Sequence, residues 1–445
     1  MTGEPALRVP WGLAERIQAR LHPEPFRERF LFGVARPLSG ARPLGRHALL
    51  EQLVQDDAED YGHATAGGLA LTDAASSRLN RWAVRLAEQG WIAVHLHSHP
   101  PGAHAFSATD DAAETALSLW LEQQGVHHYW SLIWPLGGTP KARLWSRGRA
   151  VAGQVFLGLA PVDPAPETPA PALDRQRAFG PGLRQTADRI RIGVVGVGGL
   201  GMLAVEQLAR AGFRRFVLVD PDRVEAANLN RLPGVTQQDL GGLKVRLARR
   251  LIRQVVSSLG LVPDVHAFAH DLYCSVNAQR ALRDCDLILA VTDNELSRIL
   301  ALDLALAAGR EYLQAGTDIE LADDGSIRGL RAEVTGAEVG RYCPICSGRL
   351  SPAQASIEAR VYAGGEIAAQ ARQAGYLPEV SAPAVMGLNA VAAGMLVTEI
   401  QRRASGIGVR DLLQVDLQSG TFQAVERVRS GKDCDVCGAA EKVVP

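Results

Sequence analysis

The sequence shows no excess of charge of either sign and no long apolar run. It has 47 lysines and arginines against 48 aspartates and glutamates, which leaves a net charge of −1. This balance gives no reason to expect a nucleic acid as the main partner. The longest apolar stretches, such as residues 384–397, contain Gly and Asn and are too short to span a bilayer.

A secretory signal and a disulfide framework are also missing. Residues 1–10 are mixed and polar, without the apolar run of a signal peptide. Only six cysteines occur in 445 residues, and two CxxC pairs account for most of them, which is typical of a reducing compartment. We therefore expect a cytoplasmic protein. Its hydrophobic content of 47% is enough to build the cores of two or three domains.

A proline- and alanine-rich stretch at residues 161–173 divides the chain. Such a stretch is stiff and packs poorly, so we expect a linker at 156–173 between domains at 1–155 and 174–445. Strand and helix patterns are mixed in the first domain, which predicts an α+β fold. The strands are expected at 30–35, 92–96, 129–134 and 142–145, and the helices at 11–21, 76–89 and 110–123.

In the second domain, strand patterns alternate with helix patterns. This order predicts a parallel, doubly wound α/β sheet, in which the loops after successive strands meet in one crevice. The strands are expected at 190–195, 216–219, 264–269 and 287–292, and the helices at 200–211, 243–259, 275–282 and 380–403.

A glycine-rich loop follows the first of these strands. Gly196, Gly198 and Gly201 have the G-x-G-x-x-G spacing, which lets backbone N–H groups approach a phosphate at a helix N-terminus. Asp220 ends the next strand, where a carboxylate can accept ribose hydroxyls. By themselves these residues predict a nucleotide site and fit NAD as well as ATP.

Further polar residues follow the other strands and favour phosphate chemistry. They are Asp222, Asn228, Arg231, Lys244 and Asp293. Arginine and lysine can neutralise charge that develops on an α-phosphate, and an aspartate can hold Mg²⁺ on the phosphates. A nicotinamide enzyme does not need so many groups directed at phosphate. We therefore expect an enzyme whose reaction takes place at the α-phosphate of a nucleotide.

These motifs resemble the ThiF/MoeB adenylyltransferases, relatives of the ubiquitin-activating enzymes. The resemblance covers about residues 174–440 and rests on Asp174-Arg175-Gln176, Gly196–Gly201, Asp220-Pro-Asp222, Asn228, Arg231, Lys244, Thr292-Asp293-Asn294 and the CxxC pairs. It implies a Rossmann-like domain that adenylates the C-terminal glycine of a ubiquitin-like or sulfur-carrier protein ending in Gly-Gly, with ATP and Mg²⁺. A conjugating enzyme is a possible further partner. The resemblance also implies a homodimer in which Arg175 reaches the partner's site, and it extends the nucleotide-binding set to Gly199.

The two CxxC pairs predict a structural zinc site. Four thiolates suit tetrahedral Zn²⁺ and leave no position for a substrate, and the four are Cys343, Cys346, Cys434 and Cys437. Many ubiquitin activators carry a thioester cysteine in the stretch that lies here between the pairs, and this chain has none there. Of the other two, Cys285 is expected in the core and Cys274 in a connection. We therefore expect no stable thioester.

A second site is expected far upstream. His97 and His99 alternate on one face of a strand end, and Asp110 begins a helix that can return a carboxylate. Two imidazoles, a carboxylate and a water form an open zinc site, which would supply a hydrolytic nucleophile. Ser107 is placed to donate to an oxyanion. His95 and His104 are weaker candidates as ligands.

The spacing HSHP-x₆-S-x-x-D resembles the JAB/JAMM metalloproteases, a family that includes deubiquitinases, over about residues 15–150. The resemblance implies a glutamate as general acid/base at the start of an early strand. Glu28 is the first choice, because it directly precedes an apolar run that ends in Gly33. Glu24 is the second choice, and Glu51 the third because it lies in a helix-like run.

The combined prediction is an enzyme with two active sites. The first domain would cleave a peptide or isopeptide bond after a ubiquitin-like C-terminus, and the second would adenylate that C-terminus. Two alternatives stay open at this point: an NAD-dependent oxidoreductase with a metal-binding appendage, and a scaffold that binds a ubiquitin-like protein without catalysis.

Overall fold

The computed structural model describes residues 4–24, 27–38, 46–54, 58–65, 68–166, 170–338, 342–362, 384–425 and 434–437. The chain divides into two compact units, one up to Ala165 and one from Pro166 to Lys442. No helix in the described ranges has the length and apolar character needed to cross a bilayer.

The first unit is built on a sheet that closes on itself. Its strand order is β1-β3-β2-β6-β7-β8-β9-β10, and β1 pairs with β9 as well as with β3. The sequence predicts only a mixture of helices and strands here, so the barrel-like closure is a correction. It depends on a parallel pairing between the two ends of the unit, which no local pattern reveals. The strands are β1 (Ala6–Val9), β2 (Phe30–Pro37), β3 (His47–Val54), β6 (Ile92–His99), β7 (Tyr129–Pro135), β8 (Lys141–Ser146), β9 (Arg149–Leu157) and β10 (Ala160–Pro161).

Helices cover this sheet, and a separate hairpin accompanies it. The helices are α1 (Trp11–Leu21), α2 (Asp73–Glu88) and α3 (Ala108–Gln123), and the hairpin consists of β4 (Tyr61–Thr65) and β5 (Gly68–Leu71). Residues of α1 pack with Val94 and Leu96 of β6 in one core. Ala93 packs on the opposite face with residues of α2 and α3. Because side chains alternate along a strand, His97 and His99 share the face of Ala93.

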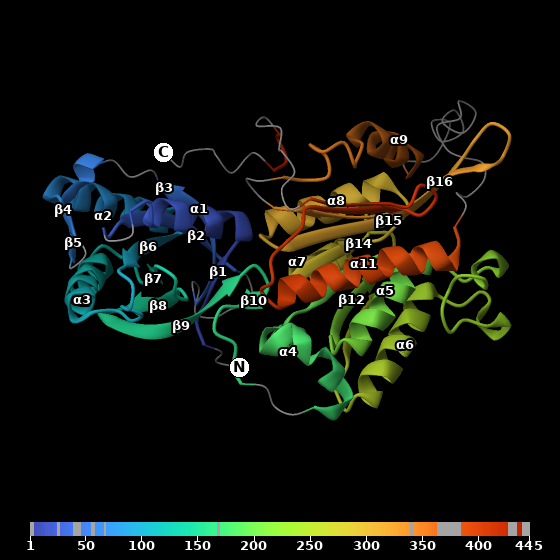
Figure 1. Ribbon diagram of the computed structural model, residues 1–445, viewed down its shortest axis with the longest axis horizontal. Helices are drawn as coiled ribbons and strands as arrows, with labels where there is room; N and C mark the ends of the chain where they lie inside the picture. Colours follow the sequence, from blue (N-terminus) through green and yellow to red (C-terminus); the bar gives the residue numbers. More distant parts are fainter. Residues whose placement is uncertain are drawn as a thin grey trace. The chain divides into compact units, whose positions relative to one another are not determined.

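The second unit is a doubly wound sheet with strand order β13-β12-β11-β14-β15-β16-β17-β18. Its parallel strands are β11 (Ile192–Val195), β12 (Arg215–Val219), β13 (Asp264–Phe268), β14 (Leu287–Ala290) and β15 (Glu311–Leu321). Helices α5 (Gly199–Arg210) and α6 (Lys244–Ser258) lie on one face, and α7 (Val276–Arg283) and α8 (Glu295–Ala307) on the other (Figure 1). The predicted parallel α/β sheet is confirmed.

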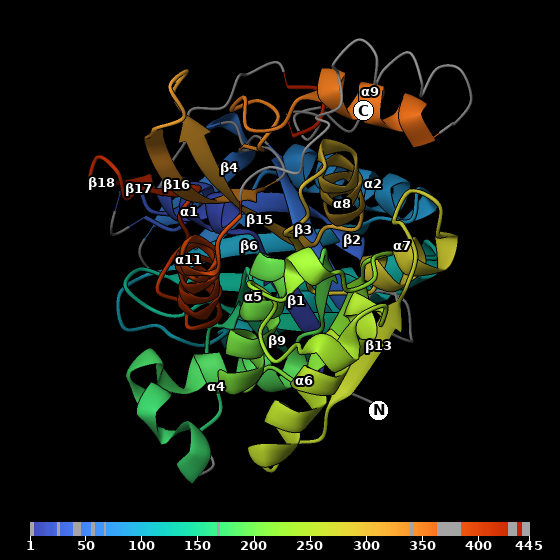
Figure 2. The ribbon, with the colours of Figure 1, turned by 90° about the vertical axis from the view of Figure 1, so that its right-hand side faces the viewer.

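Antiparallel strands extend this sheet beyond β15 (Figure 2). They are β16 (Ile327–Ala337), β17 (Leu412–Asp416) and β18 (Thr421–Val425). Helix α11 (Met386–Ala404) packs on α5 and on β15 and β16. The helix predicted for 380–403 therefore begins at Met386, and its first predicted residues lie outside the described ranges. Helix α9 (Pro352–Tyr362) packs on α8.

The stretch that the sequence assigns to a linker is partly ordered. Its start lies in β9 and β10, and residues from Pro171 onward form the 3₁₀ segment η2 (Pro171–Phe179) that leads into α4 (Gly180–Arg189). Residues 167–169 lie outside the described ranges. Proline favours the turn-like backbone of η2, since its fixed φ suits a first helical position.

Candidate functional site

A tight glycine loop joins β11 to α5. Gly196 has a φ of 94°, a left-handed conformation that glycine adopts without strain. A Cβ on Gly201 would lie 2.2 Å from the carbonyl oxygen of Gly196, so the loop can close only with glycine there. The loop therefore presents backbone N–H groups at the N-terminus of α5, an arrangement that binds phosphate.

Asp220 stabilises this loop at the end of β12. One carboxylate oxygen accepts a hydrogen bond from the N–H of Val197 at 2.7 Å, and the other accepts from the N–H of Asp222 at 2.8 Å. Burial raises the pKa of Asp220, although these two N–H groups partly oppose the shift. Asp222 in turn pairs with Lys244 Nζ at 2.8 Å. The loops after β11 and β12 and the start of α6 thus meet at one edge of the sheet.

Arg231 reaches the same place from the loop after β12. A methyl group added to Gly199 would lie 3.3 Å from Cγ and Cδ of Arg231, so the aliphatic part of the Arg231 side chain packs against the glycine loop. Asn228 has a more local contact, because its Oδ1 caps its own short helix by accepting from the N–H of Glu225 at 3.1 Å. Asn228 is 5% exposed, so the fold holds its side chain in one place.

Asn389 is a residue of this site that the sequence analysis missed. It is 4% exposed in α11, and its Nδ2 lies 2.6 Å from a Cβ built on Gly199. The Thr317 hydroxyl donates to its Oδ1 at 3.1 Å, which turns the amide N–H groups toward the loop. A lone asparagine inside the apolar stretch at 384–397 was the available signal, since a buried amide needs partners.

Asp293 is exposed and directly follows Thr292. A Cβ added to Gly196 would lie 2.8 Å from the backbone nitrogen of Thr292. The end of β14 therefore meets the glycine loop, which places Asp293 at the same edge. Arg175 is exposed in η2. No hydrogen bond or ion pair joins Arg175 to the other residues of the nucleotide site that the structure describes.

The model of one protein family matches most of this unit. It is the ThiF family, and residues 173–436 are matched. The chain belongs to the ThiF family.

Curated relatives share this region. The Sulfur carrier protein adenylyltransferase of Thermus thermophilus is 29% identical over 58% of this chain and 86% of its own length. The Adenylyltransferase and sulfurtransferase uba4 of Emericella nidulans is 37% identical over 27% of this chain and 24% of its own length. The solved structure of E. coli MccB with MccA-N7isoASN has a TM-score of 0.47 and 17% identity over 60% of this chain and 75% of that one, a likeness too distant to carry a conclusion.

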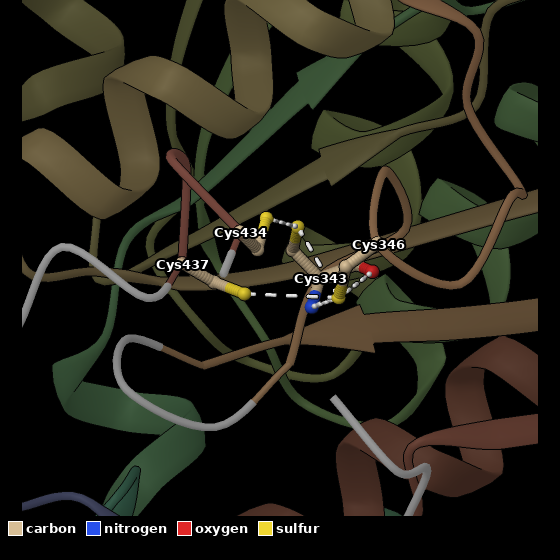
Figure 3. Close-up of side chains that lie close together, drawn as sticks. All are labelled: Cys343, Cys346, Cys434 and Cys437. Atoms are coloured by element: carbon tan, nitrogen blue, oxygen red, sulfur yellow. Dashed lines mark hydrogen bonds between the residues drawn. The ribbon is translucent and has the colours of Figure 1, made fainter. Parts of the chain in front are cut away.

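The four cysteines of this ThiF-family unit converge although the pairs lie far apart in sequence (Figure 3). The Sγ–Sγ distances are 3.7 Å for Cys343–Cys434, 3.7 Å for Cys346–Cys437 and 3.9 Å for Cys343–Cys346. Zn–S bonds of about 2.3 Å at tetrahedral angles require S–S edges of about 3.8 Å. The observed spacing therefore fits a zinc ion bound by four thiolates.

The charges of these thiols support the same interpretation. Contacts with the neighbouring thiols, first that with Cys437, lower the pKa of Cys343 to about 5. The same contact raises the pKa of Cys437, because two neighbouring thiolates repel each other. The two remaining cysteines lie outside this cluster. Cys285 is buried in the core, and burial raises its pKa. Cys274 is exposed.

The upstream residues of the first unit also converge. The Nε2 atoms of His97 and His99 lie 3.1 Å apart, and they lie 3.2 and 3.4 Å from the two Asp110 oxygens. Burial opposes ionisation of Asp110, but its hydrogen bonds with the two histidines lower its pKa well below the usual value. One ligand atom from each of His97, His99 and Asp110 lies within 4.8 Å of the other two, so the three residues could hold one metal ion.

A cavity of about 670 Å³ opens onto this cluster. Glu28 lines it together with both histidines, Asp110 and Ser107. Burial raises the pKa of Glu28, although the charges of the two histidines partly oppose the shift.

Ser107 is the N-cap of α3 and donates its hydroxyl to Asp110 Oδ2 at 2.8 Å. In this structure Ser107 therefore orients the carboxylate, a contact that the sequence analysis did not predict. Its expected role toward an oxyanion stays a prediction.

The alternative candidates lie elsewhere. Glu24 forms surface pairs with Arg27 and Arg29 and does not line the cavity. Glu51 lies in strand β3, where it pairs with Arg36, so the predicted helix-like run is wrong. The sequence around Glu51 predicts a helix because Leu and Gln favour helices, but the pairing of β3 with β1 and β2 overrides that preference.

The two weaker ligand candidates, His95 and His104, do not belong to the cluster. His95 is buried among aromatic rings, and burial together with the charge of His97 lowers its pKa to about 3, so it is neutral. His104 is exposed and does not line the cavity.

Proposed function

We propose that the ThiF-family unit adenylates the C-terminal carboxylate of a ubiquitin-like or sulfur-carrier protein with ATP and Mg²⁺. The observation that carries the proposal is the meeting of the glycine loop, Asp220, Arg231 and Lys244 at one sheet edge. The two relatives described above are adenylyltransferases, one of them of a sulfur carrier protein, and this supports the same reaction.

In this proposal each residue type has a distinct task. The loop N–H groups hold phosphate, and Asp220 accepts the ribose hydroxyls with lone pairs that its backbone contacts leave free. Arg231 and Lys244 neutralise charge on the α-phosphate, and Asp293 holds Mg²⁺. The substrate carboxylate is itself the nucleophile, so the protein contributes positioning and charge stabilisation. Arg175 would complete the site of a second copy in a homodimer.

The test compares Mg-ATP binding and ATP–pyrophosphate exchange with NADH binding. The exchange assay uses a sulfur-carrier polypeptide that ends in Gly-Gly. We expect Asp293→Ala to abolish exchange and Asp323→Ala, an exposed turn residue, to leave it unchanged. Exchange that survives Asp293→Ala would contradict the Mg²⁺ role, and NADH binding in place of ATP would favour the oxidoreductase alternative.

We further propose that the first unit is a zinc-dependent hydrolase of the JAB/JAMM type. The observation that favours it is the His97–His99–Asp110 cluster at a cavity that also contains Glu28. A bound zinc ion supplies the Lewis acidity that makes a water molecule nucleophilic near neutral pH. Glu28 would take up the proton of that water and pass it to the leaving amine, and the cavity would hold the peptide C-terminal to a ubiquitin-like chain.

Metal analysis of the purified full-length protein tests this second function. Two ligand sets predict two zinc ions per chain, and His99→Ala should lose one of them. A scaffold without catalysis would fail to cleave a ubiquitin-like precursor even with both metals bound. One zinc ion or fewer per wild-type chain would reject the upstream site.

A further inference from the structure

One buried carboxylate fixes helix α3 to the strands next to the metal-ligand cluster. Glu114 is 7% exposed, and its Oε1 accepts a hydrogen bond from Ser131 of β7 at 2.6 Å. Its Oε2 accepts from Arg143 Nε at 2.8 Å and Trp145 Nε1 at 2.6 Å, both from β8. The Tyr129 hydroxyl donates to the main-chain oxygen of Glu114 at 2.8 Å. These contacts hold the N-terminal half of α3 in one place on the sheet.

Arg143 contacts residues next to two of the three metal-ligand candidates, Asp110 and His97. Arg143 is 8% exposed and also pairs with Asp111, which follows the ligand Asp110. Its guanidinium carbon lies 3.7 Å from the ring centre of Phe106 and 4.9 Å from that of Trp145. The Phe106 ring in turn meets His97 edge to face, with 6.3 Å between the ring centres.

We propose that Glu114 and Arg143 are positioning residues for the metal site formed by His97, His99 and Asp110. The inference rests on the hydrolase function proposed above. Asp110 lies about one helical turn before Glu114, so the carboxylate that anchors α3 also sets the direction of the ligand carboxylate. Arg143 sets the Phe106 ring against His97. Partners that orient metal ligands typically change metal affinity by roughly 10–100-fold.

The experiment measures zinc affinity of the full-length protein by competition with a chelating dye, and the visible absorption of the Co²⁺ form. Glu114→Gln keeps the side-chain shape but replaces one acceptor oxygen with a donor. We expect about 10–100-fold weaker binding at the upstream site and a shifted Co²⁺ spectrum, with the four-cysteine site still filled. Glu122→Gln, the same change at the far end of α3, should behave like the wild type.

Unchanged affinity and an unchanged Co²⁺ spectrum in both Glu114→Gln and Arg143→Gln would overturn the positioning role and leave the hydrolase proposal standing. A wild type that binds only the zinc that Cys346→Ser removes would instead overturn the hydrolase proposal. Trp145→Phe decides the matter if Glu114→Gln does not fold. This change replaces the indole with a smaller phenyl ring and removes the Nε1–H donor to Glu114, so a smaller loss of affinity is expected, and no loss would overturn the inference.

Discussion

Gly199 leaves space for two side chains at the N-terminus of α5. A methyl group there would meet Asn389 Nδ2 at 2.6 Å and the Arg231 stem at 3.3 Å. Asn389 cannot move away freely, because it is buried and bonded to Thr317. Asn389 and Arg231 are therefore coupled through the packing around a single glycine of this loop.

From this we predict that Gly199→Ala costs about 1–3 kcal/mol of stability, as overpacking usually does, and weakens Mg-ATP binding. Urea unfolding and calorimetric titration measure the two effects. Gly394→Ala in α11 is the control, since no described atom lies within 4 Å of its added Cβ. Adding Asn389→Ala to Gly199→Ala should recover part of the lost stability. Strictly additive losses would show that the two residues do not clash.

At the scale of elements, the two CxxC turns connect distant parts of the second unit. The cysteines pack against the core that also contains residues of α8 and β14. A zinc ion held by the four cysteines would close this long loop in addition to the apolar contacts. Zinc binding at such a site would be coupled to folding, because the unfolded chain has no preformed site.

We therefore expect Cys346→Ser to lose the structural zinc ion and to lower the melting temperature of the second unit. Prolonged treatment of the wild type with a strong chelator should have the same effect. Cys274→Ser, an exposed cysteine outside the cluster, is the matched control and should keep both properties. A Cys346→Ser protein with full zinc content and wild-type melting would contradict the four-cysteine site.

A buried ion pair fixes the C-terminal end of α11. Arg403 is 5% exposed and Glu399 is fully buried, and the two are joined at 2.9 Å. Arg403 also pairs with Glu311 of β15 at 3.1 Å and donates to the carbonyl of Arg410 at 3.0 Å. These bonds join the helix to the sheet on whose edge the nucleotide site lies.

Arg403→Ala should cost about 3–5 kcal/mol, because it removes a buried cation and leaves Glu399 with its longer ion pair to Arg402 at 3.5 Å. Arg328→Ala removes a surface pair with Glu320 and should cost about 0–1 kcal/mol. Urea unfolding of both variants measures the difference. Equal costs would show that Glu399 finds another partner or takes up a proton in the variant.

At the scale of the whole molecule, one chain carries two sites whose proposed reactions concern the same C-terminus. Adenylation needs a free carboxylate, so a precursor that extends beyond its terminal glycine is no substrate for the second unit. The first unit could remove that extension. If both proposed activities are present, their joining in one chain would raise the local concentration of the trimmed product at the second site.

The wild type is therefore expected to support pyrophosphate exchange with an extended precursor, whereas His97→Ala should support it only with a pre-trimmed one. The pre-trimmed polypeptide is the internal control for an intact second unit. If His97→Ala uses the extended precursor equally well, maturation is not the role of the first unit. Removal of attached ubiquitin-like proteins would then be the better explanation.

The sequence by itself determined the features that depend on spacing along the chain. The glycines at 196–201 predict the phosphate loop because they stand between a strand and a helix pattern. The CxxC pairs predict a metal site because few other roles require that spacing. The alternation of His97 and His99 places both on one strand face. Each of these depends only on local geometry.

Only the tertiary structure decided the features that depend on contacts between distant segments. The closure of the first sheet follows from the pairing of β1 with β9, and the site residue Asn389 reaches Gly199 from another helix. The anchoring of α3 through Glu114 likewise needs strands that come later in the chain. Such contacts have no local signature, because a buried polar residue becomes recognisable only when its partners are known.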